Sequence, residues 1–149
     1  MLARYLGTTP EAVQITHGEH GKPRLEGTGD LAFNLSHSGQ LAVIALVRGR
    51  EVGIDVEKVV PDRDFLAIAA RAFDEEVVSE LRAARAADRA PVFYEAWVRH
   101  EARLKCLGVG IGHPAPAQPV AVESIEVGPG YAAAVAIAGE EVGRLRLLA

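Results

Sequence analysis

Two acidic residues interrupt an apolar segment, VGIDVEKVV, which covers residues 52–60 and has the composition of a buried strand. Side chains alternate between the two faces of a strand, so Asp55 and Glu57 would point to the same side. Two carboxylates so placed repel each other unless a positive charge lies between them, and a hard divalent cation with oxygen ligands is the simplest such charge. The alternative is a strand end with solvated acids. The pair is therefore a candidate metal site.

A second candidate lies in WVRHEARLKCLG, residues 97–108. Trp97, Glu101 and Lys105 are each four residues apart, so they share one face of a helix. An ordinary Glu-to-Lys surface pair would explain the last two residues. Trp97 argues for a different setting, because a tryptophan on a helix face normally lies against the core or a cleft.

A short helix and several strands are predicted to precede these residues and to position them. Residues 1–7 predict the last turns of a helix that ends at Gly7 in a left-handed conformation. Residues 13–25 predict a short strand and a Gly-Pro loop, and residues 31–59 predict three strands joined by Ser/Gly and Arg-Gly-Arg turns. LAVIALV, residues 41–47, is apolar throughout and is typical of a central strand covered on both faces.

From Asp62 to about Leu107 the chain is rich in Ala, Arg and Glu, with apolar residues three and four positions apart, which predicts helices. Pro91 fits the first turn of a second helix, which would direct Phe93, Trp97 and Leu104 toward the core. After a Pro-rich connection, the end of the chain predicts two or three strands with turns at GPG and AGEE. The order predicts an α+β fold, a mainly antiparallel sheet with packed helices.

Length and composition favour a single globular domain over residues 1–149, with 49% hydrophobic and 24% charged residues. A net charge of −4 gives no basic field for nucleic acid. No apolar run has the roughly 18 residues needed to span a bilayer, and no signal pattern precedes the first strand. The single Cys106 is expected to be a small buried apolar residue. We expect a soluble, cytoplasmic protein that binds neither nucleic acid nor membrane.

Four motifs occur in one order: GKP at 21–23, FNLSHSG at 33–39, VGIDVE at 52–57 and W-x-x-x-E-A-x-x-K at 97–105. Together they resemble the 4′-phosphopantetheinyl transferase family, in its larger, pseudo-two-fold type with a shortened N-terminal half. The resemblance implies Mg²⁺-dependent transfer of 4′-phosphopantetheine from coenzyme A to a serine of an acyl or peptidyl carrier protein. It reaches to about residue 112.

The resemblance also implies roles for individual residues. Asp55, Glu57 and Glu101 would bind Mg²⁺, and Lys105 would point at the phosphates of coenzyme A. Coenzyme A would also contact Lys22, Ser36, His37 and His100. Without the resemblance, His37 would be interpreted as a turn or core histidine.

The chain departs from the family pattern at three places. His100 stands where members usually have lysine, which lowers the positive charge because histidine is mostly neutral at pH 7. The position of a proposed catalytic base is Val77, with Glu75 and Glu76 next to it. Either the alignment shifts locally, with Glu76 as the tentative base, or the base is missing. Most of the N-terminal half of the larger type is missing.

These departures leave a second hypothesis, a non-catalytic relative that binds coenzyme A or a carrier protein. They also predict a homo-oligomer, in which another copy supplies the missing face and covers apolar surface.

Overall fold

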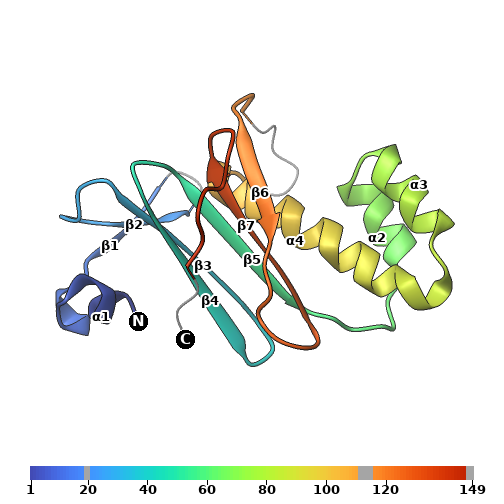
Figure 1. Ribbon diagram of the computed structural model, residues 1–149, viewed down its shortest axis with the longest axis horizontal. Coiled ribbons are helices and arrows are strands. Elements are labelled where there is room, and N and C mark those ends of the chain that lie inside the picture. Colours follow the sequence, from blue (N-terminus) through green and yellow to red (C-terminus); the bar gives the residue numbers. More distant parts are fainter. Residues whose placement is uncertain (19–20, 111–115, 147–149) are drawn as a thin grey trace.

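The computed structural model describes residues 1–18, 21–110 and 116–146 (Figure 1). Its strands and helices confirm the predicted α+β class. The order of elements is α1 (Leu2–Leu6), η1 (Pro10–Ala12), β1 (Ile15–His17), β2 (Pro23–Leu25), β3 (Leu31–Ser38), β4 (Leu41–Arg48), β5 (Val52–Lys58), α2 (Phe65–Ala72), α3 (Glu75–Ala83), η2 (Ala86–Asp88), α4 (Arg89–Leu107), β6 (Val120–Ser124) and β7 (Tyr131–Ala138).

All strand pairs inside the named sheets are antiparallel, as predicted. β1 pairs with β2, β3 pairs with β4, and β7 lies between β5 and β6. Gly7 ends α1 with φ of 67°, the left-handed cap that the sequence predicted. The hairpin of β3 and β4 lies beside β5, which is an edge strand of the three-stranded sheet (Figure 1).

Helix α4 is the central helix, and it packs along the sheet formed by β5, β7 and β6 (Figure 1). Its contact face is built from small residues: Val98, Ala102 and Cys106 pack on Ala134 and Ala136 of β7. Cys106 is only 1% exposed, which confirms its prediction as a small buried residue. Small side chains on both surfaces let the helix backbone come close to the sheet.

The other end of α4 carries an aromatic cluster that anchors α2 and α3 (Figure 1). Phe65 of α2 lies against Phe93 and Tyr94 of α4, with ring centroids 5.0 and 5.9 Å apart. Both short helices begin at an aspartate whose carboxylate accepts a backbone N–H, namely Asp64 and Asp74. These caps and the aromatic contacts explain why the segment forms helices here.

One sequence prediction is corrected. LAVIALV is not a central strand: within the described residues β4 pairs only with β3, and none of its side chains is buried. The apolar run misled because it also suits a hairpin strand with one face on the core, where Ala45 and Val47 lie. Of the two or three strands predicted near the end of the chain, two are found up to residue 146, namely β6 and β7. Part of the Pro-rich connection, residues 113–119, lies outside the described residues.

Among the residues described, none of the helices has both the length and the apolar character needed to cross a membrane.

Candidate functional site

Side chains rather than backbone join the hairpin of β3 and β4 to β5. Asn34 Oδ1 accepts the N–H of Ile54 at 2.9 Å, Ser36 Oγ accepts that of Val56 at 3.3 Å, and Ser38 Oγ accepts that of Lys58 at 3.0 Å. Every second residue of β3 thus satisfies every second N–H of β5. We call these three contacts the side-chain seam. It fixes the register between the two strands, because a shift by one residue would turn apolar side chains toward β5.

The residues of β5 between those N–H groups face α4. Gly53 lies directly under the helix, where an added Cβ would come within 2.0 Å of the Ala102 carbonyl oxygen. Because this position has no side chain, the helix can approach, and Glu101 and Lys105 then lie next to Asp55. The close packing of strand and helix therefore brings together the two acidic motifs of the sequence.

Asp55 is the centre of this group and is only 3% exposed. Its Oδ1 accepts a hydrogen bond from Ser36 Oγ at 2.8 Å and from Lys105 Nζ at 2.6 Å. Its Oδ2 is buried and has no hydrogen-bond partner among the residues that the structure describes. A buried carboxylate oxygen without a partner is energetically unfavourable, which suggests that a further ligand belongs there.

Glu57 and Glu101 complete the acidic group. Ser38 Oγ donates to Glu57 Oε2 at 2.8 Å. Within the described part of the chain, Oε1 of Glu101 is buried without a partner, as Oδ2 of Asp55 is. Burial is the main cause that raises the pKa of Glu101; the charge of Asp55 adds to the rise, Lys105 opposes it, and Glu57 adds a smaller rise. The negative charges of these carboxylates therefore repel one another.

The donor set fits a hard divalent cation. Two unpartnered carboxylate oxygens, on Asp55 and Glu101, are the ligand type that Mg²⁺ prefers. Within residues 1–18, 21–110 and 116–146, however, no three His, Cys, Asp or Glu side chains form a ready-made metal-binding group. Mg²⁺ is compatible with both observations, because it takes few protein ligands and keeps waters or phosphate oxygens as the others.

Two predicted residues lie on other surfaces. His37 is exposed on the face of β3 opposite to Ser36, so the two do not point to one place. Glu76, the tentative base, is exposed on α3, which packs beside the other end of α4. In a cleft of about 650 Å³ between α3 and α4, Val77 and His100 are both lining residues.

His100 lies edge-on to Phe73, with ring centroids 5.5 Å apart. Burial is the main cause that lowers the pKa of His100, and Arg103 adds to this, while Asp74 opposes it. The imidazole is therefore mostly neutral at pH 7 and adds little positive charge beside Glu101.

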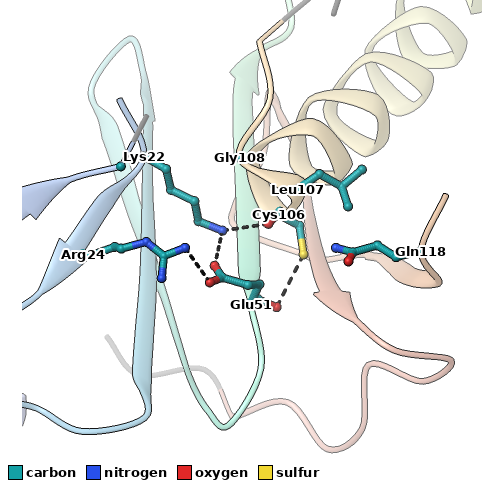
Figure 2. Close-up of a pocket in the computed structure, with 8 residues that line it drawn as sticks. Lys22, Arg24, Glu51, Cys106, Leu107, Gly108 and Gln118 are labelled. Carbon is teal, nitrogen blue, oxygen red and sulfur yellow. Dashed lines mark hydrogen bonds and ion pairs between the residues drawn. The ribbon is translucent and has the colours of Figure 1, made fainter. Parts of the chain in front are cut away.

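Lys22 lies in a separate pocket of about 210 Å³ at the C-terminal end of α4 (Figure 2). Its side chain is 8% exposed, and its Nζ donates to the Cys106 carbonyl at 2.8 Å and pairs with Glu51 at 2.7 Å. Arg24 contacts the same carboxylate at 2.9 Å. Burial raises the pKa of Glu51, but hydrogen bonds and charge from Lys22 and Arg24 outweigh it, and the pKa is lowered overall. A cation at a helix C-terminus is favourable.

Replacing Lys22 by methionine is expected to lower the free energy of unfolding at pH 7 by about 1–2 kcal/mol, because the Cys106 carbonyl loses this hydrogen bond and Glu51 keeps only Arg24. The lowered pKa of Glu51 means that this contribution is present above the unfolded-state pKa and disappears as the pH falls through the folded-state value. Urea unfolding at pH 7 and near pH 3 measures the difference. The more exposed Arg24→Met is the control, with a loss of about 0.5 kcal/mol or less.

Sequence reasoning missed Asn34 and Ser38. The signal in the sequence was the polar residues at alternate positions 34, 36 and 38. This spacing places three side chains that can form hydrogen bonds on one face of the strand.

Comparison with known proteins shows which family the chain resembles. A family model described as 4′-phosphopantetheinyl transferase superfamily matches residues 51–141. The chain is 36% identical over 114 residues to the 4′-phosphopantetheinyl transferase HetI of Nostoc sp., covering 74% of this chain and 48% of HetI. It is 30% identical over 145 residues to the 4′-phosphopantetheinyl transferase Sfp of Bacillus subtilis, covering 85% of this chain and 63% of Sfp. The chain spans about half the length of the curated relatives it matches.

Proposed function

The chain belongs to the 4′-phosphopantetheinyl transferase superfamily, and from this premise we propose that it transfers 4′-phosphopantetheine from coenzyme A to a serine of an acyl or peptidyl carrier protein. The observation that carries the proposal is the pair of buried, unpartnered oxygens on Asp55 and Glu101 beside the Lys105 ammonium. This arrangement suits a cation and a phosphate group together. We further propose that the chain is related to the larger, pseudo-two-fold type of the family.

In the proposed reaction the carrier serine oxygen bonds to the β-phosphorus of coenzyme A. The bond from that phosphorus to the bridging oxygen breaks, and 3′,5′-ADP leaves. Asp55, Glu57 and Glu101 would hold Mg²⁺, which when bound neutralises charge on the phosphates. Lys105 would place its ammonium on the same phosphates, since its Nζ already lies 2.6 Å from Asp55. The proton of the serine would pass to a base; Glu76, the tentative candidate from the sequence, is exposed on α3 and is not part of the acidic group, so no described side chain is assigned that role.

The most direct test incubates the purified chain with coenzyme A, Mg²⁺ and a panel of apo carrier proteins, and measures the intact mass of each carrier. We expect one carrier to gain the mass of a phosphopantetheine group, and EDTA to prevent the gain. No gain on any carrier, with coenzyme A binding retained, would contradict catalysis.

That contrary outcome would support a second candidate function, a non-catalytic relative that binds coenzyme A or a carrier protein. The lowered pKa and partial burial of His100 favour this candidate, because they remove positive charge where the family usually has a lysine. Saturable binding of a carrier without transfer would identify it.

We propose that the protein forms a homo-oligomer in the cytoplasm, where coenzyme A is available. Self-association would cover large apolar side chains that are exposed in the single chain, namely Tyr5, Ile15 and Leu35. Analytical ultracentrifugation measures the state, and a monomer that transfers phosphopantetheine at full rate would contradict the oligomer proposal.

Glu101→Gln is expected to stabilise the metal-free protein at neutral pH while removing transfer. The raised pKa means that the folded state holds a proton that the unfolded state has lost, so wild-type stability falls as the pH rises above about 4.3. Glutamine avoids this fall, and a gain of about 1 kcal/mol raises Tm by roughly 2–4 °C.

Thermal unfolding in EDTA at several pH values checks this prediction. Added Mg²⁺ is expected to raise Tm of the wild type but not of Glu101→Gln, because only the folded wild type binds the ion. Equal Tm values of the two proteins in EDTA at neutral pH would contradict the electrostatic explanation.

A further inference from the structure

Ser38 makes two hydrogen bonds that together fix the direction of its hydroxyl. It is the last residue of β3, and its Oγ accepts the backbone N–H of Lys58 at 3.0 Å and donates to Glu57 Oε2 at 2.8 Å. A serine hydroxyl has a single proton to donate. Because the N–H of Lys58 already points at the oxygen, that proton is directed to the carboxylate.

Ser36 repeats the same arrangement two residues earlier. Its Oγ accepts the N–H of Val56 and donates to Asp55 Oδ1. Each of the two acids on β5 is therefore held through one oxygen by one serine of β3. The period of two on β3 matches the period of two on β5, so both pairs belong to the same side-chain seam.

The turn that follows Ser38 is also held in place. Gly39 has φ of 59°, and a Cβ there would lie 3.1 Å from the Tyr131 hydroxyl and 3.2 Å from Lys58 Cδ. The N–H of Gln40 donates to that hydroxyl at 3.3 Å. Contact with Tyr131 on β7 thus fixes the hairpin end, and Ser38 cannot move away from Glu57 without breaking it.

We infer that Ser38 is a positioning residue: it holds Glu57 by Oε2 so that the other carboxylate oxygen is presented to Mg²⁺. This inference rests on the proposed function, because it needs the metal assigned there. A serine that orients a ligand carboxylate is a common outer-shell device, and its loss typically weakens metal binding about 10–100-fold.

The test measures metal binding directly, without coenzyme A, carrier or turnover. Isothermal titration of the full chain with Mn²⁺ or Mg²⁺ is expected to show about 10–100-fold weaker binding for Ser38→Ala, with Ser38→Thr near the wild type because it keeps the hydroxyl. Ser124→Ala is the matched control: Ser124 Oγ donates to Glu95, also a strand serine on a glutamate, but on β6 and outside the acidic group. It is expected to bind metal as the wild type does.

The outcomes separate the two proposals. A wild type that binds neither ion would overturn the metal assignment of the proposed function, and the inference with it. Wild-type affinity in Ser38→Ala would overturn the positioning role alone. A loss in Ser38→Thr as large as that in Ser38→Ala would also overturn it, because the hydroxyl would then not be the cause. Retained Tm in Ser38→Ala, with weaker binding, supports it.

Discussion

Asp55→Ala is expected to lower the kcat/KM of phosphopantetheine transfer by about 10³-fold or more, which corresponds to about 4 kcal/mol of transition-state stabilisation. Asp55 is the most buried of the three acids, and its loss removes both an oxygen ligand and the partner of Lys105. The lysine would then lose its ion-pair partner and keep only its hydrogen bond to Ser36 Oγ at 3.1 Å. Radioactive or mass-based transfer assays with one active carrier measure the change.

Two further variants make this prediction specific. Asp55→Asn keeps the shape of the side chain, so a similar loss of activity with unchanged Tm would show that charge is required. Asp30→Ala is the matched control, because Asp30 is exposed and pairs with Arg48 at 3.1 Å, outside the acidic group. Normal transfer rates in Asp55→Ala would sink the metal assignment.

Gly53→Ala is expected to lower the free energy of unfolding by about 3 kcal/mol or more, because its added Cβ meets closer atoms than at any other glycine that the structure describes. The new Cβ would lie 2.0 Å from the Ala102 carbonyl oxygen and 2.3 Å from the Cys106 nitrogen. Both are backbone atoms of α4, so no side chain can rotate to relieve the overlap. The helix would have to move outward, and Glu101 and Lys105 would move with it.

Urea unfolding followed by circular dichroism measures this loss, and Gly18→Ala provides the control. At Gly18 an added Cβ would meet its nearest atoms at 3.6 and 3.8 Å, which is ordinary contact, so little change is expected. A Gly53→Ala protein as stable as wild type would mean that α4 is not packed as closely on β5 as described.

The acidic site was predictable because both of its halves follow simple periods. A strand places Asp55 and Glu57 on one face, and a helix places Glu101 and Lys105 on one face. The structure brings these four residues together. The two faces can meet only because Gly53 has no side chain, which lets α4 pack closely on β5. Residue periodicity does not predict such a close approach.

Long-range side-chain partners were not predictable. Lys22 stands 84 residues from Cys106 in sequence, and its contact with that carbonyl depends on how the β1–β2 hairpin meets the end of α4. The prediction of a central strand at LAVIALV was wrong for a related reason. An apolar run indicates that a strand contacts a core, but not how many strands pair with it. Pairing is decided by the whole fold.

Because residues of FNLSHSG form the side-chain seam, the presence of this motif in a relative does not show that the relative is active. Asn34, Ser36 and Ser38 satisfy three N–H groups on a strand edge that would otherwise be open to another strand, so the fold needs them whether or not catalysis occurs. A relative that has lost transfer would still require these acceptors to protect the edge of β5. In sorting active from inactive members, acceptance of the β5 N–H groups therefore marks the architecture, whereas the contact of Ser38 with Glu57 and the oxygens of Asp55 and Glu101 mark the proposed chemistry.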